Sequence, residues 1–444
     1  GRAKAARGRR RGAAPGAPPG DAPSSVDALV ARGPRRAVAA GRAAGRKAPR
    51  AAEVSPAGGA SGGASSGASV LGSASASGTP RKAAKAGKAA VEREIRLELG
   101  RWHVLEVLVE AYERTVSSVL GGGDSARNEQ KRKRHLEAWL WARLFHPLLP
   151  LGEPAPDAAS AGDAALARKL ENAGLGTKDA AARVRRLAEL LHRPACPADI
   201  GSGVTMAQGG ERVALSCGGR TVEILPGHMD KLQALYSGAD FRNSLFLLLC
   251  RYRILQVHEK GGGNQGAVPG AVFRALQDWA GGPVVEAFAS PLNALAGAGG
   301  FHSAFADVDA PFGSRGSFFA GAFREGVVEV NPPFDEAVVQ RVAEMCDACL
   351  ARAAAAKKSL VFCVVVPEAD WPGHAALRAS RFARWVSTLP AGGHFYQVGN
   401  QHTNRTRSYP ASRNTTVLFL ASRPLEGSAR LRRAIEAAFR ARPA

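Results

Sequence analysis

The sequence predicts an α/β protein, in which a C-terminal domain with a doubly wound sheet follows a mostly helical domain and a disordered basic tail. Residues 263–444 alternate apolar runs of strand length with amphipathic helical runs, which is typical of such a sheet. Residues 91–262 have mainly helical periodicity. Residues 1–90 have almost no large apolar side chains and so cannot form a core. We therefore place domain boundaries after residues 90 and 262.

The first segment, residues 1–90, is strongly basic. It carries 17 Lys and Arg against 3 Asp and Glu, which is +14 of the net charge of +22. Because it buries little apolar surface to offset the entropy of ordering, we expect it to be disordered. Arg9-Arg10-Arg11 fits a nuclear import signal or a loose RNA contact, and the Arg-rich, acid-poor start also resembles an organellar transit peptide. We expect a nuclear location, with an organelle as the alternative.

The overall composition favours a polyanionic partner. A net charge of +22 and a pI of about 10.5 indicate nucleic acid more strongly than an anionic membrane surface. No apolar run of about 18 residues is present, so we expect no membrane span. The six cysteines lack paired spacing, which predicts reduced thiols and no metal site; Cys346 and Cys349 are expected in a helix core.

The second segment is predicted to contain five helices and one hairpin. Apolar residues at helical spacing, interrupted by glycines, predict helices over 91–120, 129–148, 164–192 (broken near Gly174), 228–236 and 241–258. Two short alternating runs around Gly218-Gly219 predict a hairpin over 213–225. We therefore expect a mostly helical domain before the sheet.

The third segment alternates strands and helices. Strands are predicted over 283–289, 327–330, 360–366, 394–398 and 415–421, and helices over 268–280, 335–354, 375–387 and 426–440. Leu360 to Val366 is apolar throughout, as in a strand buried on both faces. The last two strands would be joined by a long basic loop, residues 399–413. In such sheets, ligands bind at the carboxyl ends of the strands.

Asn331-Pro332-Pro333-Phe334 follows one of these strands directly. Two prolines fix the backbone, so the turn holds the Asn331 amide and the Pro332 carbonyl at one angle. Both oxygens can accept hydrogen bonds from an exocyclic amine, and Phe334 can stack on its ring. The turn indicates amino-directed methyl transfer from S-adenosylmethionine, although a plain strand-ending turn has the same pattern.

Several further motifs occur in a fixed order around this turn. They are Gln265 to Pro269, Phe288 to Asn293, Ser303 to Asp309, Phe312 to Phe318, Pro367-Glu368, His394 to Tyr396, Gln401-His402 and Asn414 to Leu420. Together they resemble the catalytic core of the phosphorylated-CTD-interacting factor family, over roughly residues 240–421. The resemblance implies a class I (Rossmann-like) methyltransferase domain. It also implies methyl transfer to N6 of the 2′-O-methyladenosine beside the mRNA cap.

The resemblance also implies a donor site for S-adenosylmethionine. Phe288-Ala289-Ser290-Pro291-Leu292-Asn293 takes the place of the usual glycine-rich loop, with small residues beside the methionine part and Asn293 near its amino-acid group. Either Asp307 or Asp309 would accept the ribose hydroxyls. Phe312 would close over the adenine. Asn331, Pro332, Pro333 and Phe334 would form the catalytic turn, and no metal ion is expected.

On the substrate side, capped mRNA is the expected partner. Arg251, Arg405 and Arg407 are candidate phosphate contacts, because arginine binds phosphate bidentately, although ordinary surface arginines have the same pattern. Gln265 and His402 are further candidates.

Animal members of the family carry an N-terminal WW domain that binds the phosphorylated RNA polymerase II tail. No suitably spaced tryptophan pair precedes Trp102, so we expect this chain to lack the WW domain, which leaves the polymerase tail open as a partner. Two alternatives to the cap-adjacent function remain. One is N6-adenine methylation of internal RNA or DNA, and the other is an inactive scaffold that binds RNA or polymerase.

Overall fold

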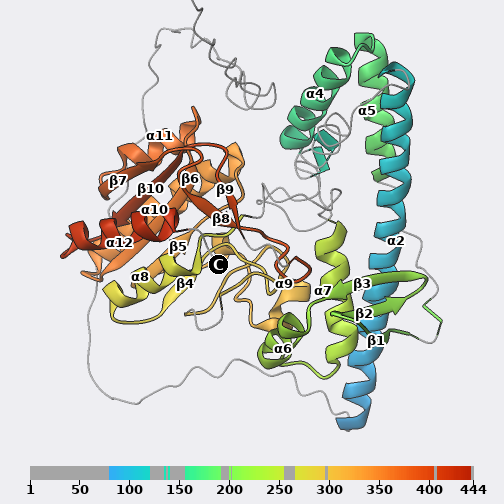
Figure 1. The fold of residues 1–444 in the computed structure, drawn as a ribbon, viewed down its shortest axis with the longest axis horizontal. Helices are drawn as coiled ribbons and strands as arrows, with labels where there is room; N and C mark the ends of the chain where they lie inside the picture. Colours follow the sequence, from blue (N-terminus) through green and yellow to red (C-terminus); the bar gives the residue numbers. More distant parts are fainter. Residues whose placement is uncertain are drawn as a thin grey trace, which may run out of the picture. The chain divides into compact units, whose positions relative to one another are not determined.

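The fold is taken from a computed structural model (Figure 1). It describes residues 80–120, 135–136, 139–140, 156–191, 200–201, 203–254, 266–295, 299–404 and 408–441. Most of the predicted tail therefore lies outside the described residues. The first described element, α2 (Pro80–Leu120), begins eleven residues before the predicted helix start.

Three helices share one apolar core. Leu108 and Tyr112 of α2 are buried against Leu170 of α4 (Pro156–Asn172) and Val184 of α5 (Thr177–Leu191). The predicted break is confirmed, because Gly174 adopts a φ of 109° between α4 and α5, a conformation that favours glycine. Of the predicted helix over 129–148, only four residues are described, and they are helical.

A second core contains the predicted hairpin. β2 (Arg212–Cys217) and β3 (Arg220–Ile224) pair antiparallel, and β1 (Thr205–Gly209), which was not predicted, adds a third strand. The hairpin packs on α6 (Pro226–Leu235) and α7 (Phe241–Ile254). Leu292, Phe305 and Phe312 from the C-terminal half belong to the same core, so α7 is joined to that half by apolar packing.

The main sheet is mixed, with strand order β4-β5-β6-β10-β7. β4 (Val284–Glu286), β5 (Gly326–Val330) and β6 (Leu360–Pro367) are parallel, and β10 (Thr415–Ala421) runs antiparallel to both β6 and β7 (Ala383–Leu389). Four helices accompany these strands: α8 (Gly270–Ala280), α10 (Glu336–Ala355), α11 (Pro372–Ala379) and α12 (Ser428–Arg440).

Side chains alternate between the two faces of this sheet, as the strand period of two requires. Val328, Phe362 and Leu418 lie in one core with α10 and α11. Val327, Cys363 and Phe419 lie in another with α8 and α12. The sheet is therefore the middle of three layers (Figure 1). Every residue of β6 is buried, as its apolar sequence predicted.

Two predictions for the C-terminal strands were wrong. The helix predicted over 375–387 ends at Ala379, and Ala383–Leu389 form the edge strand β7, because pairing with β10 outweighs local helical propensity. The strand predicted over 394–398 is the shorter β8 (Phe395–Gln397), which is not part of the main sheet. It pairs with β9 (Ser408–Pro410), inside the segment predicted as a loop. β8 and β9 thus lie beside the sheet and not in it.

Within the described segments, no helix is long and apolar enough to cross a bilayer. Cys217, Cys250, Cys346, Cys349 and Cys363 are all buried and free, and Cys196 lies outside the described residues. Burial raises the pKa of the Cys346 and Cys363 thiols well above the ordinary value. These cysteines are core side chains, as predicted for Cys346 and Cys349.

Candidate active site

The Asn-Pro-Pro-Phe turn is fixed at both ends. Asn331 directly follows β5, and its Nδ2 group donates to the Gly266 carbonyl at 2.7 Å. After the turn, the Asp335 backbone donates to the Pro333 carbonyl, and its carboxylate caps α10. The turn is therefore anchored by a strand on one side and by a capped helix on the other.

Asn331 has an unsatisfied acceptor. The residue is 7% exposed, and the bond from Nδ2 to Gly266 fixes which way its amide points. The other amide atom, Oδ1, is buried and has no hydrogen-bond partner. A buried carbonyl oxygen without a donor costs about 1–3 kcal/mol, so it needs an explanation, as do the other such atoms among the described residues, for example Asn243 Oδ1 and Glu329 Oε1.

Aromatic side chains lie next to this turn. Phe334 contacts Tyr396 edge to face at 5.9 Å between ring centroids, and Tyr396 stacks on Tyr409 at 6.1 Å. The Tyr396 hydroxyl is fixed by Thr415 Oγ1 at 2.8 Å. β8 holds Tyr396 here, since Ala267 and Gln397 exchange two backbone hydrogen bonds beside Gly266. Tyr409 was missed because it lies in the segment predicted as a loop.

The segment Ser290–Leu295, the 290–295 loop, follows β4 and forms a tight turn. Asn293 Oδ1 accepts hydrogen bonds from the Ser290 backbone at 2.6 Å and from Ser290 Oγ at 2.8 Å. The Asn293 and Ala294 backbones donate back to the Ser290 carbonyl. The Asn293 oxygen is thus occupied within the loop, and its Nδ2 group remains to donate to a ligand.

Two charged residues outside the loop also hold it. Glu286, the last residue of β4, accepts a hydrogen bond from the Leu295 backbone at 3.0 Å. Lys231 of α6 donates from Nζ to the Ala294 carbonyl at 2.5 Å. Burial raises the pKa of Glu286 to about 7, although the positive charge of Lys231 lowers it in part. Burial also lowers the pKa of Lys231. Neither residue was predicted, because lone charges carry no motif.

A second buried carboxyl group neighbours Glu286. Glu329 of β5 is its register partner across the parallel pair, and its Oε1 has no hydrogen-bond partner. Burial raises the pKa of Glu329 well above the ordinary value, and the charge of Glu286 raises it further. Glu286, Glu329 and Asn331 therefore lie near the carboxyl ends of adjacent strands, where ligands bind in such sheets.

The two candidate ribose ligands, Asp307 and Asp309, differ in how accessible their carboxyl groups are. Asp309 is fully buried, accepts the Tyr252 hydroxyl at 2.8 Å, and has its pKa raised by burial to about 7. The Asp307 side chain is 51% exposed and pairs with Arg251 at 3.1 Å. Of the two, only Asp307 presents an accessible carboxylate.

The structure places Arg251 differently from the sequence prediction. Its side chain is 6% exposed, and its Nε lies 2.9 Å from Glu98. With Asp307 on its other side, the guanidinium is engaged by two carboxylates. An RNA phosphate would have to displace one of them, because burial favours the paired arrangement.

The aromatic residues predicted to contact the donor lie in apolar cores. Phe312 is fully buried and packs on Tyr236 at 5.2 Å and Phe241 at 6.3 Å. Phe288 is half-buried and packs on Phe318 at 5.0 Å. Phe312 is therefore part of an apolar core and offers no free ring face to a ligand.

The remaining substrate candidates are not brought together. Gln265, Arg405 and Arg407 lie outside the described residues. His402 is buried, its carbonyl accepts the Leu225 backbone, and burial lowers the pKa of its imidazole to about 3. It is therefore neutral at physiological pH. No cluster of three His, Cys, Asp or Glu side chains that suits a metal ion occurs among the described residues.

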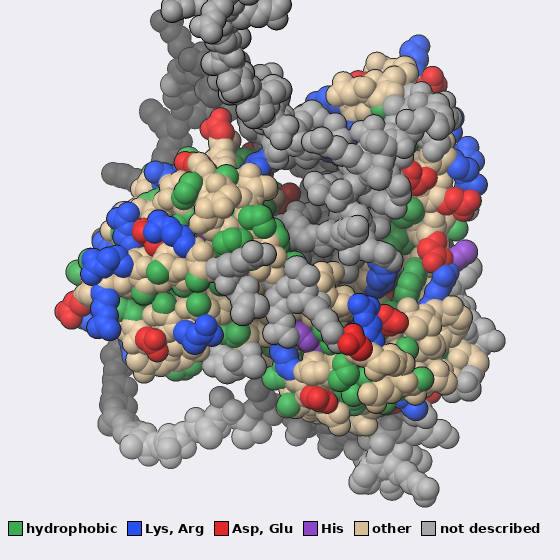
Figure 2. Space-filling view, in the orientation of Figure 1, with side chains coloured by type: hydrophobic (Ala, Val, Ile, Leu, Met, Phe, Trp, Pro, Cys, Tyr) green, Lys and Arg blue, Asp and Glu red, His purple; other side chains and the backbone are tan. Residues whose placement is uncertain are grey.

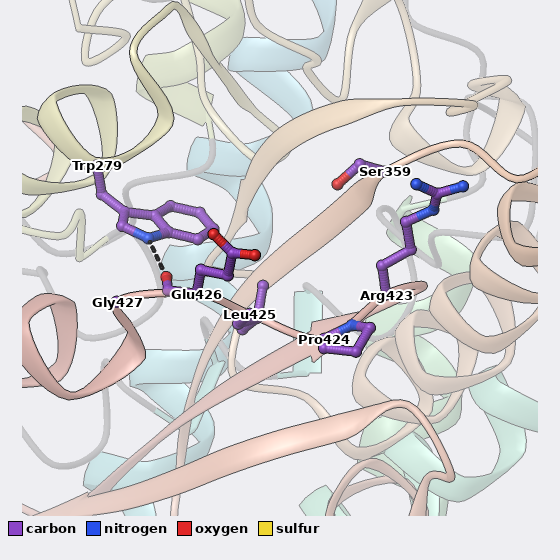
Figure 3. A pocket seen from close by; sticks show the side chains of 7 residues that line it. All are labelled: Trp279, Ser359, Arg423, Pro424, Leu425, Glu426 and Gly427. Atoms are coloured by element: carbon purple, nitrogen blue, oxygen red, sulfur yellow. Dashed lines mark hydrogen bonds between the residues drawn. The ribbon is translucent and has the colours of Figure 1, made fainter.

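A cleft of about 540 Å³ lies elsewhere (Figure 3). Trp279, Ser359, Arg423 and Glu426 line it, and Trp279 Nε1 donates to the Glu426 carbonyl. Ser359 directly precedes β6, so the cleft is at the amino-terminal ends of the parallel strands. It is remote from Asn331, which follows the carboxyl end of β5.

Comparison with known proteins agrees with the family that the motifs indicated. A family model described as "Phosphorylated CTD interacting factor 1 WW domain" matches residues 231–399. This match corrects our expectation that the chain lacks the WW domain. That expectation considered only tryptophan spacing before Trp102, whereas the matched region begins at residue 231 and runs from α6 to β8.

Two curated mammalian proteins are similar to this chain. Both are named mRNA (2′-O-methyladenosine-N(6)-)-methyltransferase: one from Homo sapiens, 35% identical over 222 residues, and one from Mus musculus, 33% identical over 219 residues. Each match covers 46% of this chain but only 30% of the relative. Over somewhat less than half of its length, the chain is thus similar to mammalian mRNA N6-methyltransferases, and its residues 231–399 to the phosphorylated CTD interacting factor family.

Proposed function

We propose that this protein is an S-adenosylmethionine-dependent RNA methyltransferase that modifies N6 of the 2′-O-methyladenosine next to the mRNA cap. The observation that carries the proposal is the buried, unpartnered Oδ1 of Asn331, in a turn whose Phe334 packs on Tyr396. An acceptor kept without a donor at a cost in stability suits a ligand that brings its own N–H groups. The names of the mammalian relatives support the same chemistry.

The finer fold assignment is part of this proposal. The parallel strands β4, β5 and β6, with helices on both faces, support a class I, Rossmann-like methyltransferase domain over residues 263–444. The 290–295 loop and Asn331 both follow carboxyl ends of these strands. We propose a helical domain up to residue 262 and a basic tail before it, with their boundary moved from residue 90 to residue 80, where α2 begins.

The residues present fit a nucleoside donor. The accessible carboxylate of Asp307 suits two ribose hydroxyls, and the Nδ2 group of Asn293 suits a carboxylate. Ala289 and Ser290 have small side chains, which suit close backbone approach. When bound, S-adenosylmethionine supplies a methyl group activated by a sulfonium charge.

The acceptor side stabilises the reacting amine. The N6 lone pair of adenine is delocalised into the ring, so the amine is a poor nucleophile. Asn331 Oδ1 and the Pro332 carbonyl accept its two hydrogens, and this favours the pyramidal nitrogen of the transition state. Phe334 orients the ring by stacking. The fixed turn holds these groups in position before the substrate binds. Because they need no further ordering, the free-energy barrier of methyl transfer is lower.

For partners, we propose capped mRNA and, from the description of the family match, the phosphorylated tail of RNA polymerase II. A net charge of +22 supports a polyanionic partner. We propose a nuclear location, where caps are made.

The test is methyl transfer from labelled donor to four short RNAs. They begin with capped 2′-O-methyladenosine, capped adenosine, uncapped adenosine or capped guanosine, and single-stranded DNA is a fifth substrate. We expect transfer only where a cap precedes adenosine, and the strongest with 2′-O-methylation. Equal transfer to uncapped RNA or DNA would favour an internal adenine target, and no transfer to any substrate would favour a scaffold.

A further inference from the structure

The 290–295 loop is held from three directions. Its own Asn293 closes the turn through Ser290, and Glu286 of β4 accepts the Leu295 backbone. The third attachment comes from outside the sheet, where Lys231 of α6 reaches the Ala294 carbonyl, 63 residues away in sequence. Two of the three attachments are therefore side chains that no donor-site motif includes.

Lys231 is well placed to influence this loop. The residue is half-buried, and α6 is fixed to the core by Leu232, which is fully buried. The ammonium group has three N–H donors, of which the Ala294 carbonyl takes one. Hydrogen bonds from charged donors contribute more than neutral ones, particularly away from bulk water.

The charge of Lys231 also acts on the Glu286 carboxyl. The charge of Lys231 favours the ionised form of Glu286, and the Glu286 charge in turn raises the pKa of the neighbouring Glu329. The ionised form is the better acceptor for the Leu295 N–H. Lys231 thus holds the loop twice, directly at Ala294 and through Glu286 at Leu295.

We propose that Lys231 is a positioning residue, which holds the 290–295 loop in the conformation that receives the methionine part of the donor. The inference rests on the proposed function and deepens it. It also means that an element of the helical domain, α6, completes the donor site of the sheet domain.

The test compares three variants with wild type. Lys231→Met keeps the aliphatic stem and removes the charge, and Lys231→Arg keeps a charged donor. Lys178→Met is the matched control, because Lys178 lies exposed in the first turn of α5. Calorimetry gives the Kd for S-adenosylmethionine, and steady-state assays give kcat and the KM for RNA at saturating donor.

We expect Lys231→Met to raise the donor Kd by about 10-fold or more, which is the effect of losing one hydrogen bond to a charged group. The KM for RNA and the kcat at saturating donor should remain within about 2-fold. Lys231→Arg should recover most of the affinity, and Lys178→Met should bind like wild type. An unchanged donor Kd in Lys231→Met, or equal losses for donor and RNA, would overturn the inference.

Two readouts separate positioning from general stabilisation. Donor affinity of wild type should fall as the pH drops through about 7, where Glu286 gains a proton, and the midpoint should move to higher pH in Lys231→Met. Amide exchange at Ala294 and Leu295 should speed up in Lys231→Met without donor. Unchanged exchange there overturns the inference, whereas a wild type that binds no donor overturns the proposed function.

Discussion

Replacing Asn331 with alanine should separate the catalytic role that we propose for this side chain from any role in stability. The substitution removes the 2.7 Å hydrogen bond to the Gly266 carbonyl, a loss of about 0.5–1.5 kcal/mol. It also removes the buried Oδ1 that has no partner, which relieves a penalty of about 1–3 kcal/mol. The two effects oppose each other, so the free energy of unfolding should stay within about 2 kcal/mol of wild type.

Activity should respond quite differently. If Oδ1 accepts the N6 hydrogen in the transition state, its loss should lower kcat by roughly 10²–10³-fold, as removal of one preorganised hydrogen-bonding group does. Labelled methyl transfer to capped RNA measures this loss, and urea unfolding measures stability. Asn331→Asp is the paired variant, because it keeps an acceptor but sets a carboxylate oxygen against the Gly266 carbonyl. It should be less stable than Asn331→Ala and equally inactive.

The reasoning would be refuted by either of two results. Full activity of Asn331→Ala would mean that the unpartnered oxygen does not meet the reacting amine. A loss of more than about 3 kcal/mol of stability would place the residue among structural polar groups instead.

Three further outcomes follow from the same contacts. Burial raises the pKa of Glu286 from an ordinary 4.5 to about 7, so the stability that its proton contributes is present at low pH and lost as pH rises through 7. Wild type should therefore lose unfolding free energy between pH 5 and pH 8, and Glu286→Gln should make this loss smaller by up to about 3 kcal/mol, as measured by urea unfolding. An equal loss in the variant would contradict this. A Cβ added at Gly266 would overlap the Tyr409 hydroxyl, so Gly266→Ala should lower methyl transfer by about 10-fold. Adding Tyr409→Phe to this variant should restore most of the activity. Without such a rescue, the overlap with Tyr409 is not the cause of the loss. The imidazole of His402, with a pKa of about 3, should show no NMR titration between pH 5 and pH 8, and a midpoint in that range would show that it is accessible.

Local pattern predicted much of the fold correctly. The apolar run at Leu360 to Val366 is a strand buried on both faces, and the break near Gly174 separates two helices. Asn331 follows a strand, because β-branched residues stop at two prolines. Each of these features depends on neighbours in sequence, and periodicity reports such features well.

Pairing between distant strands was not predictable in the same way. Residues 383–387 were predicted as the end of a helix but belong to the edge strand β7, since β10 supplies hydrogen bonds along its length. β8 is not part of the main sheet, because it pairs with β9 in a segment that was predicted as a loop. Strand propensity depends on the partner and the face, and neither is written in the strand itself.

The sequence by itself determined the Asn-Pro-Pro-Phe turn, the basic character and the alternation of strands and helices, because each is a property of consecutive residues. Only the tertiary structure placed Lys231 on the Ala294 carbonyl, paired Arg251 with Asp307, and left the Oδ1 of Asn331 without a donor. The two contacts join residues that are 63 and 56 positions apart, and the third feature depends on what surrounds one atom. Burial and charge pairing arise only when the chain is folded, so no local motif records them.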